Sequence, residues 1–277
     1  MNIIKESNKI TITNCDDFDV VQTLNCGQIF RFVIDGNVAK VFSQNKICKI
    51  NFSKDKIELN SNDIDYFYNF FDLNRDYSTI KNELRKDDFL KNAVDYGAGI
   101  RIINNDAYEM IISFIISANN NIKRIKNSIE HLCKNFGTNM GEYFAFPTLN
   151  QLKNAKVEDF KTAGLGYRAE YMAETVERLS EEEIQALTLM DEEGKFKFLT
   201  SLKGVGEKVA NCIMLFGLQV KTVFPVDTWI NKVYNNLTNS QTTDRKKITK
   251  ELTKRYKELS GFAQQYFFYY YRDNNLK

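Results

Sequence analysis

The sequence has very little proline, histidine or tryptophan, and its cysteines follow no metal-binding or disulfide pattern. Of its 277 residues, two are proline, one is histidine, one is tryptophan and five are cysteine. An odd number of scattered cysteines argues against a disulfide framework and indicates a reducing compartment. With one histidine, His131, and no Cys-x-x-Cys pair, neither a zinc site nor a histidine-based catalytic dyad is expected.

The sequence also lacks an excess of basic over acidic residues, or of acidic over basic ones. The chain has 38 basic and 36 acidic residues, for a net charge of +2, so no global basic field indicates nucleic acid. Basic residues concentrate only in residues 243–257, TDRKKITKELTKRYK, which form either a solvated helix face or a DNA contact. The sequence has no long apolar run and no charged-then-apolar leader, so we expect a cytoplasmic protein without a membrane partner.

The first 60 residues have the pattern of β-strands. β-branched and aromatic residues alternate with polar ones in residues 9–14, 28–44 and 45–60. Asp35-Gly36 divides the second of these ranges and predicts a hairpin turn.

From about Ser61 the apolar spacing becomes helical, and it stays so to the end of the chain. Ser180 followed by Glu183 predicts a capping box at the start of one helix. The length allows one or two domains. We expect an α+β fold, with a small twisted antiparallel β-sheet and flanking helices in residues 1–97 and a mainly α-helical body in residues 98–277.

Residues 202–234, LKGVGEKVANCIMLFGLQVKTVFPVDTWINKVY, contain the strongest functional signal. Gly204 and Gly206 flank Val205 and allow a tight turn directly before a helix-forming run. Free N–H groups at the start of a helix, together with the helix dipole, favour a bound phosphate. We therefore expect a phosphate-gripping hairpin between two helices at about residues 196–217.

Two side chains of this segment suit chemistry on nucleic acid. Lys208 lies in the first turn of the expected helix, and a neutral lysine amine can attack C1′ of a flipped nucleotide and stay bonded to the sugar. Asp227 precedes the run TWINKVY at a natural N-cap position, where a fixed carboxylate can stabilise positive charge on the sugar as the base departs. The alternatives are a plain DNA-binding hairpin and a simple helix cap.

This segment resembles the helix-hairpin-helix plus Gly/Pro–Asp signature of base-excision DNA glycosylases, and Lys208 points to the branch that cleaves through a Schiff base. Cys212 lies one helical turn after Lys208, on the same face. Burial and the helix dipole would lower the pKa of the lysine, whereas a Cys212 thiolate would raise it, and the sequence leaves the sum open. Cys212 is either a small core residue or part of a pocket.

Two further segments are similar to the 8-oxoguanine DNA glycosylases in the regions that bind the damaged base. In NCGQIFRF, the resemblance implies that the Gly27 carbonyl accepts the N7–H of 8-oxoguanine, which guanine lacks. In GFAQQYFFYYYRDNN, it implies that Gln264 bonds to the Watson–Crick edge of the flipped base and that Phe268 stacks on it. Cys212 would then cover the opposite face of the base.

Two more segments are similar to the regions of that family that contact the opposite strand. In SANNNIKRI, Asn119 and Arg124 would contact the cytosine left behind when the lesion flips out. In GLGYRAEY, Tyr167 would wedge into the vacated stack and Arg168 would bind the orphan cytosine.

The resemblance implies a bifunctional enzyme of bacterial type that excises 8-oxoguanine from duplex DNA, preferably opposite cytosine, and cleaves the abasic site. It implies a monomer in the cytoplasm, associated with the nucleoid through DNA, with no organic or redox cofactor and with hairpin carbonyls that could hold a structural monovalent cation. The competing interpretations are an alkylated-base DNA glycosylase and a non-catalytic damaged-DNA-binding protein.

The chain departs from its relatives at two points. Trp229 stands two residues after Asp227, where animal and fungal members have a histidine, so the residue closing the pocket there is open. The cysteine cluster that forms the iron–sulfur loop of endonuclease-III-like enzymes is absent from the sequence.

Overall fold

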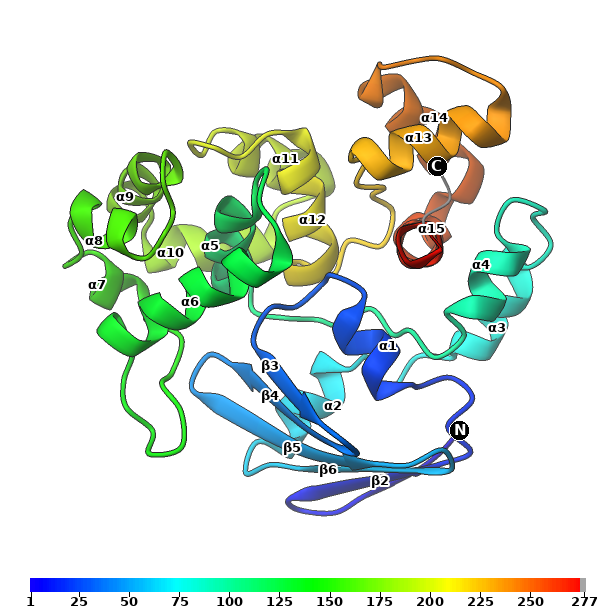
Figure 1. The fold of residues 1–277 in the computed structure, drawn as a ribbon, viewed down its shortest axis with the longest axis horizontal. Helices are drawn as coiled ribbons and strands as arrows, with labels where there is room; N and C mark the ends of the chain where they lie inside the picture. Colours follow the sequence, from blue (N-terminus) through cyan, green and yellow to red (C-terminus); the bar gives the residue numbers. More distant parts are fainter. Residues whose placement is uncertain (275–277) are drawn as a thin grey trace.

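The computed structural model describes residues 1–274, which form an antiparallel sheet beside a larger helical body (Figure 1). The sheet has six strands in the order β1-β2-β6-β5-β4-β3. The strands are β1 (Asn2–Lys5), β2 (Lys9–Thr13), β3 (Phe32–Asp35), β4 (Val38–Ser43), β5 (Lys46–Phe52) and β6 (Lys56–Asn60). The predicted α+β class is confirmed.

Alternation of side chains sets the register of this sheet. Ile10 and Ile12 of β2 are fully buried and lie opposite Leu59 and Ile57 of β6. The predicted hairpin joins β3 to β4, and Gly36 has the positive φ, +54°, that such a turn needs. The sequence pattern does not indicate β1, because this short edge strand is largely exposed and has no buried face.

The rest of the described chain forms helices and the loops that connect them. The first four in chain order are α1 (Val20–Asn25), α2 (Ile64–Phe70), α3 (Tyr77–Leu84) and α4 (Lys91–Tyr96). Those of the body are α5 (Ala107–Ser117), α6 (Ile122–Phe136), α7 (Leu149–Leu152), α8 (Val157–Thr162), α9 (Arg168–Arg178), α10 (Glu181–Leu189), α11 (Glu192–Thr200), α12 (Glu207–Gly217), α13 (Thr228–Thr238), α14 (Arg245–Tyr256) and α15 (Ser260–Asp273). The capping box predicted at Ser180 and Glu183 starts α10.

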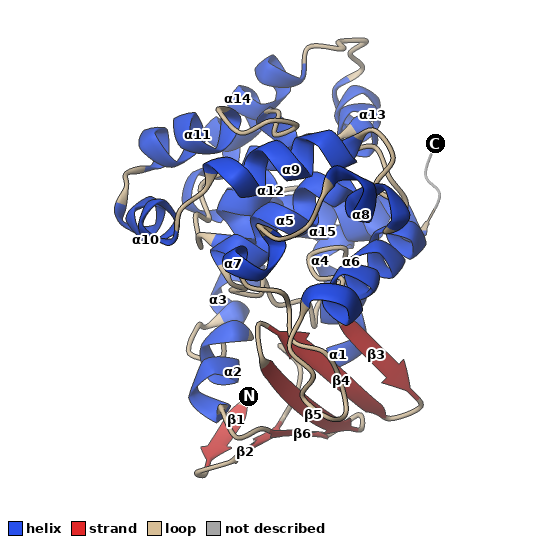
Figure 2. Cartoon of the chain, turned by 90° about the vertical axis from the view of Figure 1, so that its left-hand side faces the viewer, coloured by secondary structure: helices blue, strands red, loops and turns tan. Residues whose placement is uncertain are grey.

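The apolar helix α5 lies at the centre of the helical body (Figure 2). It packs against α12, α6, α9 and α10, and almost all of its side chains are buried. It lies along α12, the second helix of the predicted hairpin: Ala107 and Met110 approach Gly217, and Phe114 approaches Lys208. A second apolar cluster lies on the sheet and is covered by α1 and α2.

The last helix, α15, connects regions that are far apart in the sequence. It packs against α4, α13 and α14 (Figure 1). Its Arg272 side chain hydrogen-bonds the Asn25 carbonyl at the end of α1. Residues from the beginning, middle and end of the chain therefore meet at one place. Within residues 1–274, no helix is long and apolar enough to cross a membrane.

Candidate active site

The predicted hairpin joins α11 to α12. Gly204 has a φ of +79°, and a Cβ there would lie 2.6 Å from Cδ2 of Tyr171, so both conformation and space require glycine. Gly206 is the N-cap of α12 and is exposed, with no atom near the position of a Cβ. The Val205 N–H donates inward to the Leu202 carbonyl at 3.1 Å. The amides that face outward for a phosphate therefore include those of Gly206 and the first turn of α12.

Lys208 lies in the first turn of α12, with its Nζ 5.6 Å from the centre of the Phe114 ring of α5. Cys212 is 4% exposed and follows Lys208 by one turn on the same face of α12. The charge of a Cys212 thiolate, followed by that of Asp227, raises the pKa of Lys208, and burial acts in the opposite direction. Burial raises the pKa of Cys212, so its thiol is protonated at neutral pH. Lys208 must therefore lose a proton before it can act as a nucleophile.

Asp227 is the N-cap of α13, as predicted. Its carboxylate accepts the Ile230 N–H at 2.9 Å, which fixes the side chain at the start of the helix. The preceding Phe224, Pro225 and Val226 are buried, so the approach to the cap is also held in place. The Asp227 charge raises the pKa of both Lys208 and Cys212, which shows that the carboxylate lies close to the pair.

One cavity of about 460 Å³ brings together the predicted catalytic and base-binding residues. It lies among α5, α12, α13, α15 and the turn after α1. Six predicted residues line it: Gly27, Lys208, Cys212, Asp227, Gln264 and Phe268. Cys212 is thus both buried and part of the cavity wall, so the two interpretations of this residue are compatible.

The part of the wall formed by Gly27, Gln264 and Phe268 has the features of a pocket for a flat, hydrogen-bonding ligand. Gly27 has a φ of +85°, and a Cβ there would lie only 3.0 Å from the Phe268 ring, so glycine allows this close approach. Gln264 is 6% exposed, and its Oε1 has no hydrogen-bond partner within the described part of the chain. A buried amide oxygen without a partner is costly, so it indicates a donor supplied by a ligand.

Trp229 lines the same cavity next to Asp227. Its side chain is half-buried, and the Nζ of Lys232 lies 5.5 Å from its ring. The structure therefore places an aromatic wall at the position where the sequence left the closing residue open.

The residues predicted to contact the opposite strand lie outside this cavity, on two neighbouring turns. Asn119 is exposed with a φ of +50°, and Arg124 is exposed in the first turn of α6. Tyr167 is the N-cap of α9 and is 54% exposed, as a wedge requires. Their contacts with the opposite strand stay predictions.

Arg168 differs from these three because it is only 5% exposed. Its guanidinium donates to the carbonyls of Ala118 at 2.6 Å, Asn119 at 2.7 Å and Leu165 at 3.2 Å. Arg168 therefore joins the two turns to each other in this structure, and contact with an orphan base would require it to exchange at least one of these bonds.

Twelve other cavity residues were not among the predicted site residues. They are Phe30, Phe114, Ser117, Asn120, Asn121, Ile122, Lys123, Ile125, Phe216, Pro225, Gln265 and Arg272. Phe114 lies in a continuous apolar run that is typical of a core helix, so nothing local marks it. Arg272 was detectable, because it follows Phe268 by four residues and shares its helix face.

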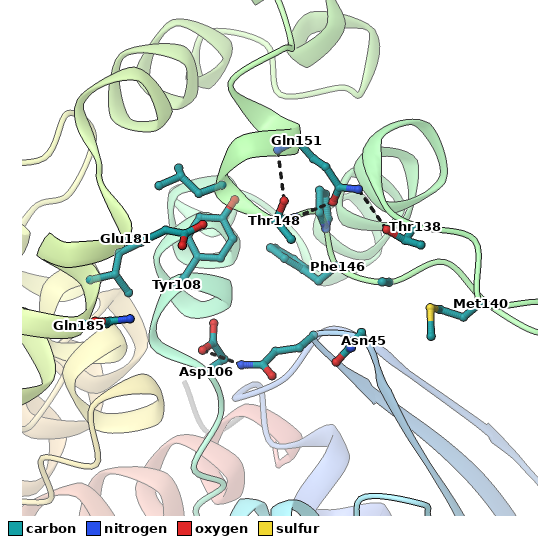
Figure 3. Close-up of a pocket in the computed structure, with 15 residues that line it drawn as sticks. Asn45, Asp106, Tyr108, Thr138, Met140, Phe146, Thr148, Gln151, Glu181 and Gln185 are labelled. Atoms are coloured by element: carbon teal, nitrogen blue, oxygen red, sulfur yellow. Dashed lines mark hydrogen bonds between the residues drawn. The ribbon is translucent and has the colours of Figure 1, made fainter.

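A larger cavity of about 540 Å³ lies elsewhere, between the β4–β5 turn and the helices α7 and α10 (Figure 3). Asp106 and Glu181 line it, and Asp106 accepts a 2.8 Å hydrogen bond from Gln44. Among the described residues that form its wall there is no lysine or arginine. Two carboxylates without a counter-charge disfavour a polyanion, so the smaller cavity is the candidate active site.

Two further expectations concern charge near the hairpin. The basic segment 243–257 forms α14, and Lys246 pairs with Glu207 of α12 at 2.8 Å, which brings its first turn to the hairpin. Both interpretations of this segment remain open. Among residues 1–274, no cluster of three or more His, Cys, Asp or Glu side chains is placed to hold a metal ion. A monovalent cation on the hairpin carbonyls stays a prediction.

Comparison with known proteins assigns the family. Residues 112–258 match the HhH-GPD superfamily of base excision DNA repair proteins, and residues 9–111 match the N-terminal domain of 8-oxoguanine DNA glycosylases. The chain belongs to the HhH-GPD superfamily of base excision DNA repair proteins. A probable N-glycosylase/DNA lyase of Methanothermobacter thermautotrophicus is 30% identical over 239 residues, which cover 77% of this chain and 75% of the relative.

Solved structures agree with this assignment. The Clostridium acetobutylicum 8-oxoguanine glycosylase/lyase, in complex with double-stranded DNA containing cytosine opposite 8-oxoguanine, has a TM-score of 0.93 and 35% identity. That match covers 100% of this chain and 99% of the other. A 3-methyladenine DNA glycosylase from Archaeoglobus fulgidus has a TM-score of 0.79 with 18% identity, over 96% of this chain and 99% of that one, and shares the fold.

Proposed function

We propose that this chain is a bifunctional 8-oxoguanine DNA glycosylase and abasic-site lyase that acts on duplex DNA. One observation carries the proposal: Lys208 and Asp227 line the same cavity as Gly27, Gln264 and Phe268. A nucleophile, a fixed carboxylate and a pocket for a flat base are the parts that glycosidic bond cleavage requires. The similarity to the C. acetobutylicum enzyme over the whole chain supports the same substrate.

In the proposed reaction, the neutral amine of Lys208 attacks C1′ of the flipped nucleotide. The Nζ–C1′ bond forms as the C1′–N9 bond breaks, and the base leaves with the bonding electrons and takes up a proton. Asp227 stabilises the positive charge that develops on the sugar. Loss of the Nζ proton and opening of the sugar ring give an imine, and β-elimination then breaks the strand on the 3′ side.

Recognition of the base would rest on Gly27, Gln264 and Phe268 in the cavity wall. The Gly27 carbonyl accepts the N7–H of 8-oxoguanine, whereas guanine N7 is itself an acceptor and would be repelled. The free Gln264 amide bonds to the Watson–Crick edge, and Phe268 stacks on the ring. The hairpin amides hold the phosphate backbone.

The decisive experiment is incubation of the protein with a duplex that carries one 8-oxoguanine, followed by electrophoresis of the products with and without borohydride. We expect strand cleavage without alkali, and a covalent protein–DNA product when borohydride is present. Cleavage of an alkylated-base duplex in preference to this one would support the alkylated-base alternative. Binding without any cleavage would support the non-catalytic alternative.

The excision rate should rise as pH is raised from neutral towards the pKa of Lys208, because only the neutral amine is nucleophilic. A Cys212 thiolate raises the pKa of Lys208 most, and this thiolate forms only at alkaline pH, so Cys212→Ser should leave the excision rate near neutral pH unchanged and move the alkaline part of the profile to lower pH. Single-turnover rates measured at a series of pH values test this expectation. An unchanged profile in the serine variant would show that Cys212 does not control the protonation of Lys208.

Excision should be faster opposite cytosine than opposite adenine. Cytosine presents O2 and N3 as acceptors, which suit an arginine, whereas adenine places its N6 donor where the arginine also donates. Arg124→Ala should reduce the difference in activation free energy between excision opposite cytosine and opposite adenine. The expected reduction is roughly 1–3 kcal/mol, the contribution of a good bidentate base contact.

The measurement is single-turnover excision opposite each of the four bases. The matched control is Lys134→Ala, because Lys134 is an exposed basic residue in the last turn of the same helix. This control should leave the preference unchanged. Equal wild-type rates opposite cytosine and adenine would contradict the idea.

A further inference from the structure

Three side chains of α15 contact the end of α1 and the turn that follows it. Arg272 Nη1 donates to the Asn25 carbonyl at 2.8 Å. The Gln265 amide contacts the Cys26 carbonyl at 3.4 Å and the Cys26 Sγ at 3.2 Å. Gly27 lies against the Phe268 ring. The turn therefore depends for its position on a helix about 240 residues later in the chain.

Arg272 is itself held in one orientation. Its Nε donates to the carboxylate of Asp273 at 2.8 Å, and its Nη2 lies 2.7 Å from the same oxygen. The Arg272 and Asp273 side chains are 22% and 27% exposed, so the pair is partly shielded from solvent. The guanidinium also lies 5.5 Å from the centre of the Phe268 ring. The guanidinium of Arg272 thus lies over the Phe268 ring, and its Nη1 atom donates to the Asn25 carbonyl.

These contacts between α15 and residues 25–27 control the direction in which the Gly27 carbonyl points. Glycine with a φ of +85° has neighbouring backbone conformations of similar energy, so the carbonyl would rotate if the turn were free. A charge-assisted hydrogen bond to the carbonyl two residues earlier restrains that rotation. Arg272 does this without contact to Lys208 or to the hairpin amides.

We propose that Arg272 is a positioning residue for lesion recognition, which aims the Gly27 carbonyl at the base that stacks on Phe268. This inference rests on the proposed function, because it assumes that the base occupies the cavity. It predicts that Arg272 matters for excision of the damaged base and not for the chemistry at the sugar.

The test compares two activities of the same variant. Arg272→Met should lower single-turnover excision of 8-oxoguanine by roughly 10- to 100-fold, as expected for loss of a hydrogen bond to a charged group. Strand cleavage at a preformed abasic site should stay within about twofold of wild type, because no base is present to be aimed. Arg272→Lys keeps a charged donor and should recover part of the excision rate.

The matched control is Arg85→Met, which removes an arginine that pairs with Asp95 at 2.7 Å outside the cavity. It should leave both activities unchanged. Equal excision by Arg272→Met and wild type would overturn the proposal, and so would a parallel loss of excision and abasic-site cleavage, since that pattern indicates general damage to the fold. If the wild type itself fails to excise 8-oxoguanine, the proposed function and this assignment are both wrong.

Discussion

Replacing Lys208 with glutamine should abolish both excision of 8-oxoguanine and covalent trapping by borohydride. The amide has no nucleophilic lone pair on nitrogen, so neither the bond to C1′ nor the imine can form. Binding to lesion-containing duplex should persist, because the hairpin grips phosphate through backbone N–H groups and not through this amine. The measurements are single-turnover excision, electrophoresis after borohydride treatment, and equilibrium binding with the same duplex.

Lys203→Gln is the matched control for this variant. Lys203 lies in the same hairpin, but it is not part of the cavity wall. Its side chain is 54% exposed, and its Nζ lies 3.7 Å from a carboxylate oxygen of Glu174. This variant should excise and become cross-linked like the wild type. A Lys208→Gln variant that still forms the covalent product would show that another amine is the nucleophile.

Replacing Asp227 with asparagine should slow excision by roughly 100- to 1,000-fold, the usual effect of removing one group that stabilises a charged transition state. Asparagine caps helices about as well as aspartate does, so the start of α13 should survive the change. This substitution therefore separates the carboxylate's charge from its structural role. The expected outcome is a large fall in the single-turnover rate with little change in the free energy of unfolding.

Asp244→Asn is the corresponding control, because Asp244 caps α14 by accepting the Lys247 N–H and lies outside the cavity. It should change neither excision nor stability appreciably. Asp227→Ala, in contrast, should lose both the charge and the cap, with a stability cost of about 0.5–2 kcal/mol. Near-normal excision by Asp227→Asn would mean that Asp227 acts only as a cap.

Local rules were sufficient wherever a feature depends on a few consecutive residues. The Asp35-Gly36 turn, the capping box of Ser180 and the cap at Asp227 were all predictable, because each is decided by backbone conformation and hydrogen bonds within one turn. The pairing of Lys208 with Cys212 was predictable for the same reason, since residues four apart share a helix face.

The structure was needed where contacts cross the chain. In the sequence, Phe114 has the pattern of an ordinary core residue in an apolar helix. Only the packing of α5 against α12 places its ring beside the Lys208 amine. From the sequence, Arg168 is expected to be a basic side chain available to DNA. In the fold, its guanidinium donates to backbone carbonyls of two turns. Neither result follows from propensity, because both depend on which helices meet.

By itself the sequence determined the fold class, the hairpin, the Lys208–Asp227 pair and, through resemblance, the residues of the base pocket. Only the tertiary structure decided that these residues line one cavity, that Trp229 forms part of its wall and that Arg272 holds the Asn25–Gly27 turn against α15. The physical reason is distance along the chain. Gly27 and Phe268 meet because burial of apolar surface brings α1, α12 and α15 together, and no local signal encodes that contact.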